Sequence, residues 1–188
     1  MPTLMSGVLL FAGVHLFPSV AAPTRARLIA RIGQSAYNGG FALSVSIAIG
    51  LIVLGWRHSD VVAVYAPPAW GRLAVNLAMP IALLFFLASR VPTNLERLVR
   101  HPQLTGVACW SLAHLLANGD SRALVLFGGL AVWSIGEMVL IDRREGAWSR
   151  PAPVPWVADL KPLVAAAVAF FVLRWAHPWF TGASALPG

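Results

Sequence analysis

The sequence predicts an all-α fold: a polytopic transmembrane bundle of about six spanning helices that forms a single domain over residues 1–188. Of the 188 residues, 58% are hydrophobic and only 11% are charged, whereas a soluble domain carries about 25% charged residues. The hydrophobic residues form long runs without the period-2 alternation typical of a membrane β-barrel. A backbone inside lipid must satisfy its own hydrogen bonds, which favours helices. These observations exclude a water-soluble enzyme.

Six apolar runs define the expected helices, namely residues 4–22, 39–56, 70–89, 103–118, 123–141 and 163–175. A spanning helix needs roughly 20 apolar residues, and the fourth run is short by that measure. The first run is not preceded by Lys or Arg, as the start of a secretory signal peptide would be. We therefore expect it to be retained as the first span.

The basic residues predict how the chain is oriented. The gaps after the first, third and fifth runs hold ten of the fourteen Lys and Arg residues: Arg25, Arg27, Arg31, Arg90, Arg97, Arg100, Arg143, Arg144, Arg150 and Lys161. The positive-inside rule assigns these gaps to the cytoplasm and both termini to the outside. The net charge of +7 is then explained by loops beside anionic lipid headgroups, so no nucleic-acid partner is expected.

Local signals mark the helix ends. We expect Gly119 to adopt a positive φ as a C-cap and Asp120 to cap the fifth helix, which makes residues 118–120 a tight junction. Pro102 suits the first turn of the fourth helix, where a missing N–H costs nothing. The Pro-rich and Trp-containing segment 143–162 is expected to be an ordered loop at the headgroup level.

Four ionisable residues stand out at depth within the apolar runs, where each needs a partner or a function. They are His15, His114, Glu137 and Arg174. We expect Glu137 to pair with the nearby arginines of segment 143–144, and Arg174 to extend its charge to the outer surface. The two histidines are the candidates for chemistry.

His15 and His114 can either hydrogen-bond across helices or share an iron. Small and aromatic residues flank both: Gly7 and Phe11 share a helix face with His15, whereas Gly106, Trp110 and Ala117 share one with His114. Counting residues places His114 about 5–10 Å further out than His15. No third strong ligand lies at depth, and Cys109 is the only cysteine, which disfavours a zinc site. Haem needs only one or two axial ligands and an apolar slot.

The remaining histidines lie nearer the membrane surfaces. His101 follows Arg100 at the cytoplasmic edge, where the pair can cap the fourth helix or bind a haem propionate, together with Arg97. His177 is read as an interfacial anchor, and no specific role is expected for His58.

Several motifs, in a fixed order, carry a resemblance to a known family: Gly13-Val14-His15, Arg100-His101-Pro102-Gln103, a segment 110–119 that begins Trp110-Ser111, Phe127-Gly128-Gly129 and Ala176-His177-Pro178-Trp179. They resemble, from end to end, the NnrU family of bacterial membrane proteins, which is related to the zeta-carotene isomerase of plants and cyanobacteria. The resemblance implies a multi-pass protein of the bacterial inner membrane, for which the outside assigned above to both termini is the periplasm. It also implies haem b held by two transmembrane histidines, here His15 and His114. Together with the positions described above, this makes Trp110, Ser111, His101 and Arg100 the further cofactor-binding candidates.

The resemblance leaves three function classes open. Members of the bacterial branch are associated with denitrification, which implies a haem protein that reacts with or senses nitric oxide. The isomerase branch implies haem-dependent cis–trans isomerisation of an apolar polyene, but the isomerase has a cysteine three residues before its fourth-span histidine, where this chain has Ser111. The third class is a non-haem assembly or structural partner whose histidines pack the bundle.

Overall fold

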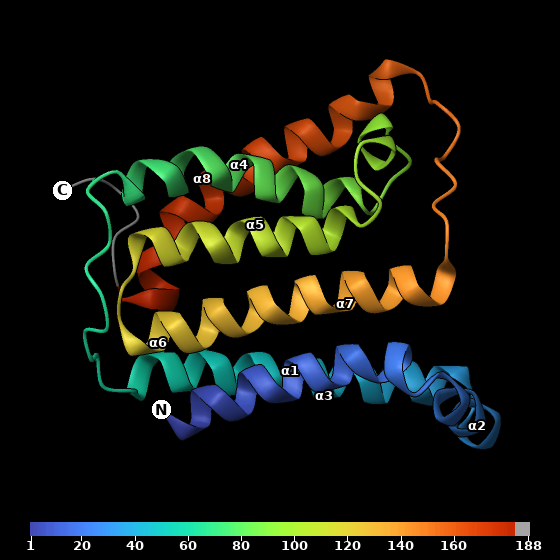
Figure 1. The fold of residues 1–188 in the computed structure, drawn as a ribbon, viewed down its shortest axis with the longest axis horizontal. Coiled ribbons are helices and arrows are strands. Elements are labelled where there is room, and N and C mark those ends of the chain that lie inside the picture. The colour runs from blue at the N-terminus through green and yellow to red at the C-terminus, as the bar shows by residue number, and fades with distance from the viewer. Residues whose placement is uncertain (183–188) are drawn as a thin grey trace.

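The computed structural model describes residues 1–182, in which the predicted all-α membrane fold is confirmed (Figure 1). The helices are α1 (Pro2–Val20), α2 (Ala22–Ile32), α3 (Gln34–His58), α4 (Gly71–Ala88), α5 (Pro102–Ala117), α6 (Ser121–Ala123), α7 (Gly129–Glu145) and α8 (Leu160–Thr181). The 3₁₀ turns η1 (Asn94–Arg97) and η3 (Trp156–Asp159) lie in loops. One π-helical turn, η2 (Leu124–Gly128), joins α6 to α7 and makes Ser121–Glu145 one continuous span.

Five helical segments of the described chain are long and apolar enough to cross a membrane. The sixth expected span is α5, which has 16 residues and therefore extends about 24 Å at 1.5 Å per residue. It runs between α4 and α7 from one end of the bundle to the other (Figure 1). The fourth span is thus short, as its apolar run predicts.

The chain crosses the bundle back and forth, so that its turns lie at two opposite ends (Figure 1). We call one the terminal end: it holds Met1, Thr181, the loop 59–70 and the junction 118–120. We call the other the basic end: it holds the segments 21–33, 89–101 and 142–161. All ten basic residues assigned to the cytoplasm belong to segments of the basic end.

The first basic segment is itself a helix, α2, where the sequence predicts only a gap between spans. Its Ile29 and Ile32 lie on the face opposite Arg27 and Arg31. This arrangement is typical of a helix that lies in the membrane interface. The Arg25 guanidinium is 5.2 Å from the centre of the Tyr37 ring, which ties α2 to the start of α3 through a cation–π contact.

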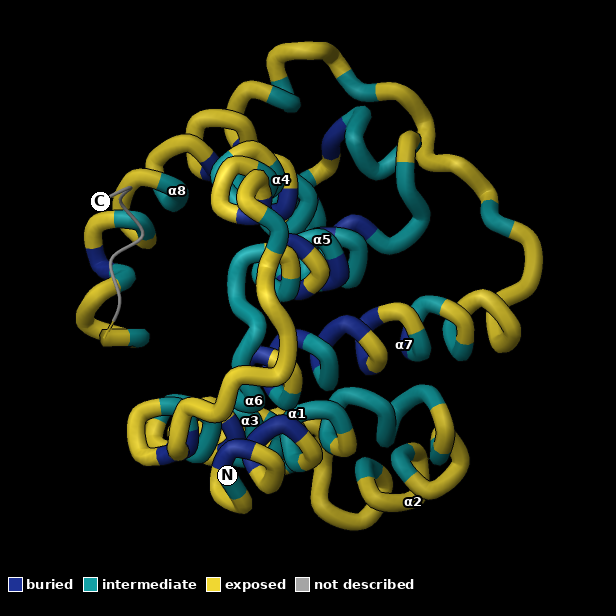
Figure 2. The backbone as a smooth tube through the Cα atoms, turned by 60° about the vertical axis from the view of Figure 1, so that its left-hand side comes forward, coloured by how far each residue is buried: buried dark blue, intermediate teal, exposed yellow. Residues whose placement is uncertain are grey.

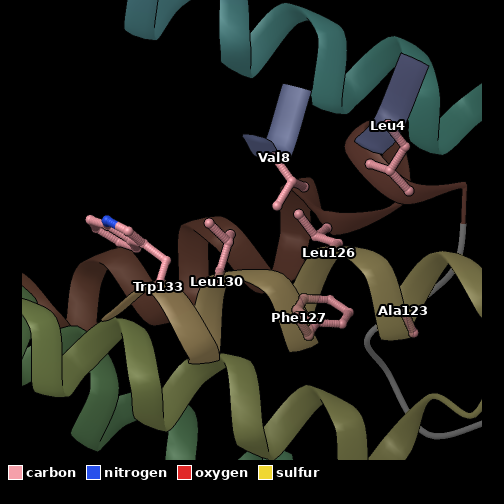
Figure 3. Packing of buried hydrophobic residues seen from close by; sticks show 7 residues of the cluster. All are labelled: Leu4, Val8, Ala123, Leu126, Phe127, Leu130 and Trp133. Atoms are coloured by element: carbon pink, nitrogen blue, oxygen red, sulfur yellow. The ribbon is translucent and has the colours of Figure 1, made fainter. Parts of the chain in front are cut away.

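The best-buried cluster joins α1 to α6, η2 and α7 (Figure 3), and it consists of Leu4, Val8, Ala123, Leu126, Phe127, Leu130 and Trp133. Glycines let helix backbones approach closely, both between α1 and α3 and between α4 and α5. A Cβ added to Gly55 would lie 2.4 Å from the Leu4 nitrogen, and one added to Gly106 would lie 2.6 Å from the Ala82 carbonyl oxygen. Small residues at such contacts are typical of helices packed in lipid. Exposed residues cover the outward sides of α3, α4 and α8 (Figure 2), and many are large and apolar, as a lipid-facing surface requires.

The junction between α5 and α6 confirms one predicted cap and corrects the other. The Asp120 side chain accepts hydrogen bonds from the backbone nitrogens of Arg122 and Ala123, as an N-cap does. The predicted positive φ of Gly119 is wrong: in the described chain, positive φ occurs at Gly33, Gly146 and Gly182. Gly119 is needed for a different reason, because a Cβ there would lie 2.0 Å from the Tyr65 carbonyl oxygen.

Candidate functional site

A cavity of about 600 Å³ lies between the helices toward the terminal end. Phe11 of α1 and Ile52 and Trp56 of α3 form one side, and α4 and α8 form the other. Trp110 and His114 of α5 and Phe127 of η2 contribute further lining residues. Most of the lining is aliphatic or aromatic, and the volume lies within the roughly 300–1,000 Å³ of small-molecule sites.

His114 is held on the cavity wall by contacts on two sides. Its Nδ1 lies 2.8 Å from the Trp110 carbonyl oxygen, and its ring stacks on Phe127 with centroids 4.6 Å apart. Phe127 belongs to the π-helical turn, which rotates side chains away from their α-helical directions and is frequent at functional sites. Because Nδ1 donates to the carbonyl, the Nε2 lone pair is available to a metal.

His15 has the same local geometry on α1. Its Nδ1 lies 2.8 Å from the Phe11 carbonyl oxygen, and its ring stacks on the Phe11 ring at 4.2 Å and meets Trp133 edge-on at 5.1 Å. Phe11 lines the cavity, whereas His15 is not among its lining residues. His15 therefore lies one helical turn beyond the wall, toward the basic end.

The two histidines lie at different levels of the bundle. His114 packs on Phe127 and His15 on Trp133, and these two residues are six positions apart along the same span. At 1.5 Å per residue this is an offset of about 9 Å. The structure thus places His15 and His114 at different levels of the bundle rather than side by side.

A comparison with protein families identifies the family to which the chain belongs. The family model described as NnrU protein matches residues 3–185, which is nearly the whole chain. The chain belongs to the NnrU family. A search of curated proteins and a search of solved structures found no match to it.

A second histidine of this NnrU protein lies on the cavity wall, a position that the sequence pattern did not predict. His177 of α8 lines the same cavity as His114. Phe170, Arg174 and His177 follow one another at spacings of four and three residues, which places them on one face of α8. That spacing could have indicated that His177 shares a helix face with Arg174. The neighbouring Pro178 and Trp179 instead favoured the interpretation of His177 as an interfacial anchor.

Arg100 and His101 lie at the opposite end of this NnrU protein, the basic end. The Arg100 guanidinium pairs with Asp142 at 2.9 Å and with Glu145 at 3.3 Å. His101 Nε2 lies 2.9 Å from the same Asp142 carboxylate. These contacts join the start of α5 to the end of α7, so both residues already have partners there and neither lines the cavity.

Trp110 and Ser111 are neighbours in sequence with different surroundings. Trp110 lines the cavity, and its ring meets Phe127 edge-on at 5.0 Å. Ser111 is fully buried and is not a lining residue. Its hydroxyl has no hydrogen-bond partner within the described chain. The residue in place of the isomerase cysteine thus lies away from the cavity.

Glu137 has a different partner from the arginine pair expected. Its buried carboxylate accepts a hydrogen bond from the Ser19 hydroxyl of α1. Arg144 instead binds the Pro18 carbonyl and Glu145. The predicted Glu–Arg pairing is therefore wrong, because α1 passes close to α7 and supplies a nearer donor. Across residues 1–182, no group of three or more His, Cys, Asp or Glu gathers as a metal site.

Proposed function

We propose that this NnrU protein is an integral membrane haem-b protein that acts in nitrogen-oxide metabolism of the denitrification type. The observation that carries the proposal is His114, whose imidazole lines an apolar cavity with Nδ1 engaged by the Trp110 carbonyl. This is the arrangement in which a histidine presents Nε2 to a metal while a backbone carbonyl fixes its ring.

The residues of the cavity fit a haem. Trp110, Phe127 and Phe11 offer flat aromatic surfaces to a macrocycle, and no Asp or Glu is among the lining residues of the described chain. Most of the lining is apolar, as an apolar ring requires, and His114 offers that ring a strong iron ligand. Bound haem would supply an iron that takes up nitric oxide and exchanges electrons.

His114 is the first ligand in this proposal and His15 the second. With the 9 Å level difference estimated above from the rise per residue, His15 reaches the same iron only if α1 slides along α3 and α7, the helices on which it packs. Phe11, which separates His15 from the cavity, would have to turn aside. Without that shift His114 would hold the iron without His15, and the bound haem would supply the nitric-oxide chemistry.

The test is a reduced-minus-oxidised spectrum of detergent-purified protein with a pyridine haemochrome assay. His114→Ala should lose most of the haem, and His15→Ala should lose it or give a high-spin spectrum. His58→Ala is the control, since His58 lies at the exposed end of α3 and outside the cavity. If both deep-histidine variants keep the wild-type haem content and spectrum, the ligand assignment is wrong.

A second candidate function is the haem-dependent isomerisation of an apolar polyene. The aliphatic lining of the cavity favours it, with Ile49, Ile52 and Val53 from α3 and Met79 and Leu83 from α4. Conversion of a cis polyene by the purified haem-loaded protein would support this function over nitric-oxide chemistry. A purified protein that contains no haem would instead favour an assembly or structural role.

A further inference from the structure

The cavity has a polar end and an apolar end. The order of lining residues along three helices shows which end is which. On α4, Arg72 and Asn76 come before Met79 and Leu83; on α8, Phe170 comes before Arg174 and His177; on α5, Trp110 comes before His114 and Asn118. The chain of α4 leaves the terminal end, whereas α5 and α8 run toward it (Figure 1). The polar residues of all three helices therefore gather at the terminal end of the cavity, and the apolar residues lie deeper.

The polar end is positively charged. Arg72 and Arg174 both line it, and Arg174 lies on the ring of Phe170 at 5.9 Å from its centre. The ion pairs found within residues 1–182 involve Arg100, His101, Arg122 and Arg144, and thus neither of the two cavity arginines. Two guanidinium groups that border an apolar cavity without a carboxylate partner are a binding arrangement for an anion, since the guanidinium fork matches carboxylate geometry.

We propose that Arg72 and Arg174 bind the carboxylate head of an amphipathic ligand whose apolar body fills the cavity. If that ligand is haem b, its two propionates are the carboxylates, and the assignment then rests on the proposed function. This assignment predicts that the propionates bind at the terminal end. Arg100 and His101 lie at the basic end, where they form ion pairs with Asp142 and Glu145. A long-chain fatty acid has the same chemistry, a carboxylate on an apolar body, and is the other source of such a ligand.

The experiment compares haemin with haemin dimethyl ester, which keeps the iron and the ring but carries no carboxylate charge. Full-length protein from haem-limited cells is titrated with each in detergent, with binding followed by the Soret band and tryptophan quenching. Wild type should bind haemin at least about tenfold more tightly than the ester, which corresponds to about 1.4 kcal/mol. The double variant Arg72→Gln, Arg174→Gln should bind the two alike, with its affinity for the ester unchanged.

Arg57→Gln is the matched control, because Arg57 is an exposed arginine in the last turn of α3 that does not line the cavity. It should keep the full preference for haemin. The variant Arg72→Lys, Arg174→Lys should recover part of the preference, since ammonium groups keep the charge but lose the fork. A gel-filtration profile equal to that of wild type shows that each variant is folded.

The outcomes separate this inference from the proposed function. If wild type binds haemin and its ester equally well, the arginine site is wrong and the haem proposal stands. If wild type binds neither, the haem proposal fails, and titration with a fluorescent long-chain fatty acid decides the arginine site alone. Fatty-acid binding that the double glutamine variant loses supports the site, whereas no binding by wild type overturns it.

Discussion

His114 and His15 make the same local contact. In each residue, Nδ1 lies 2.8 Å from the carbonyl oxygen four residues earlier. This contact requires only a helix, so it follows from the sequence once the two spans are recognised. What differs is the neighbour of each ring, which is Phe127 at the cavity for His114 and Phe11 with Trp133 beyond the cavity for His15. At the residue scale, therefore, His114 is the better-placed ligand.

Ser111→Cys tests whether position 111 can reach the iron. Ser111 is fully buried and does not line the cavity, so a thiol there should leave the oxidised and reduced haem spectra unchanged. Optical spectra of the purified variant check this. Thiolate features confined to the oxidised form would contradict the placement and favour the isomerase function.

Ser19→Ala should destabilise the protein by about 1–3 kcal/mol, because it leaves the buried Glu137 carboxylate without its hydrogen-bond donor. Glu137→Gln should cost less, since the amide oxygen still accepts the hydroxyl proton. Unfolding of the detergent-solubilised protein by heat or by SDS measures both. Ser46→Ala is the control, as the exposed Ser46 hydroxyl binds only the Ala42 carbonyl of its own helix; an equal loss in Ser46→Ala would refute the role of Glu137.

At the scale of elements, close backbone contacts decide how neighbouring segments fit. The loop 59–70 packs on the junction between α5 and α6, where the Val64 nitrogen donates to the Gly119 carbonyl at 2.8 Å and the Ser121 nitrogen donates to the Val62 carbonyl at 2.8 Å. These contacts hold the start of α4 beside the end of α5. Gly71 allows α4 to approach α5 closely at this point, since a Cβ there would lie 1.8 Å from the Leu116 carbonyl oxygen.

Gly119→Ala should lower the free energy of unfolding by about 1–3 kcal/mol, as is typical of overpacking. The reason is the 2.0 Å approach of the added Cβ to the Tyr65 carbonyl oxygen, not backbone strain. Thermal unfolding in detergent measures the effect. Gly136→Ala is a matched control on α7, where no atom lies within 4 Å of the added Cβ, and it should be neutral or stabilising. An unchanged stability of Gly119→Ala would show that the loop does not pack as described.

At the scale of the whole molecule, the six crossing segments and the positions of their loops form one consistent pattern. The first and last described residues lie at the terminal end, and the segments with ten of the fourteen basic residues lie at the basic end. The polar end of the cavity is also at the terminal end, which the positive-inside rule predicts to face the periplasm.

Fusion of a reporter after Gly188 tests this orientation. A reporter active only in the periplasm should be active there, and one active only in the cytoplasm should be inactive. Replacing Arg25, Arg27 and Arg31 together by Gln should weaken the orientation more than replacing Arg57 and Arg72, because charge beside the first span usually dominates. Activity of the cytoplasmic reporter at Gly188 in the wild type would contradict the assignment.

The sequence by itself determined the fold class, the apolar runs that form the long helices and the grouping of ten basic residues at one end of the bundle. These depend on hydropathy, charge and residue spacing along one helix, which are properties of local segments. The approximate offset between His15 and His114 follows from the same residue count.

Only the tertiary structure decided which side chains surround the cavity. In lipid nearly every face of a spanning helix is apolar, so periodicity does not reveal which face meets a neighbour, and close packing of small residues sets the contacts instead. That packing placed His177, Arg72 and Arg174 on the wall, left Ser111 off it, and gave Glu137 a serine partner from α1. It also made Gly119 necessary for a close approach to Tyr65 rather than for its φ, a distance that depends on segments far apart in the sequence.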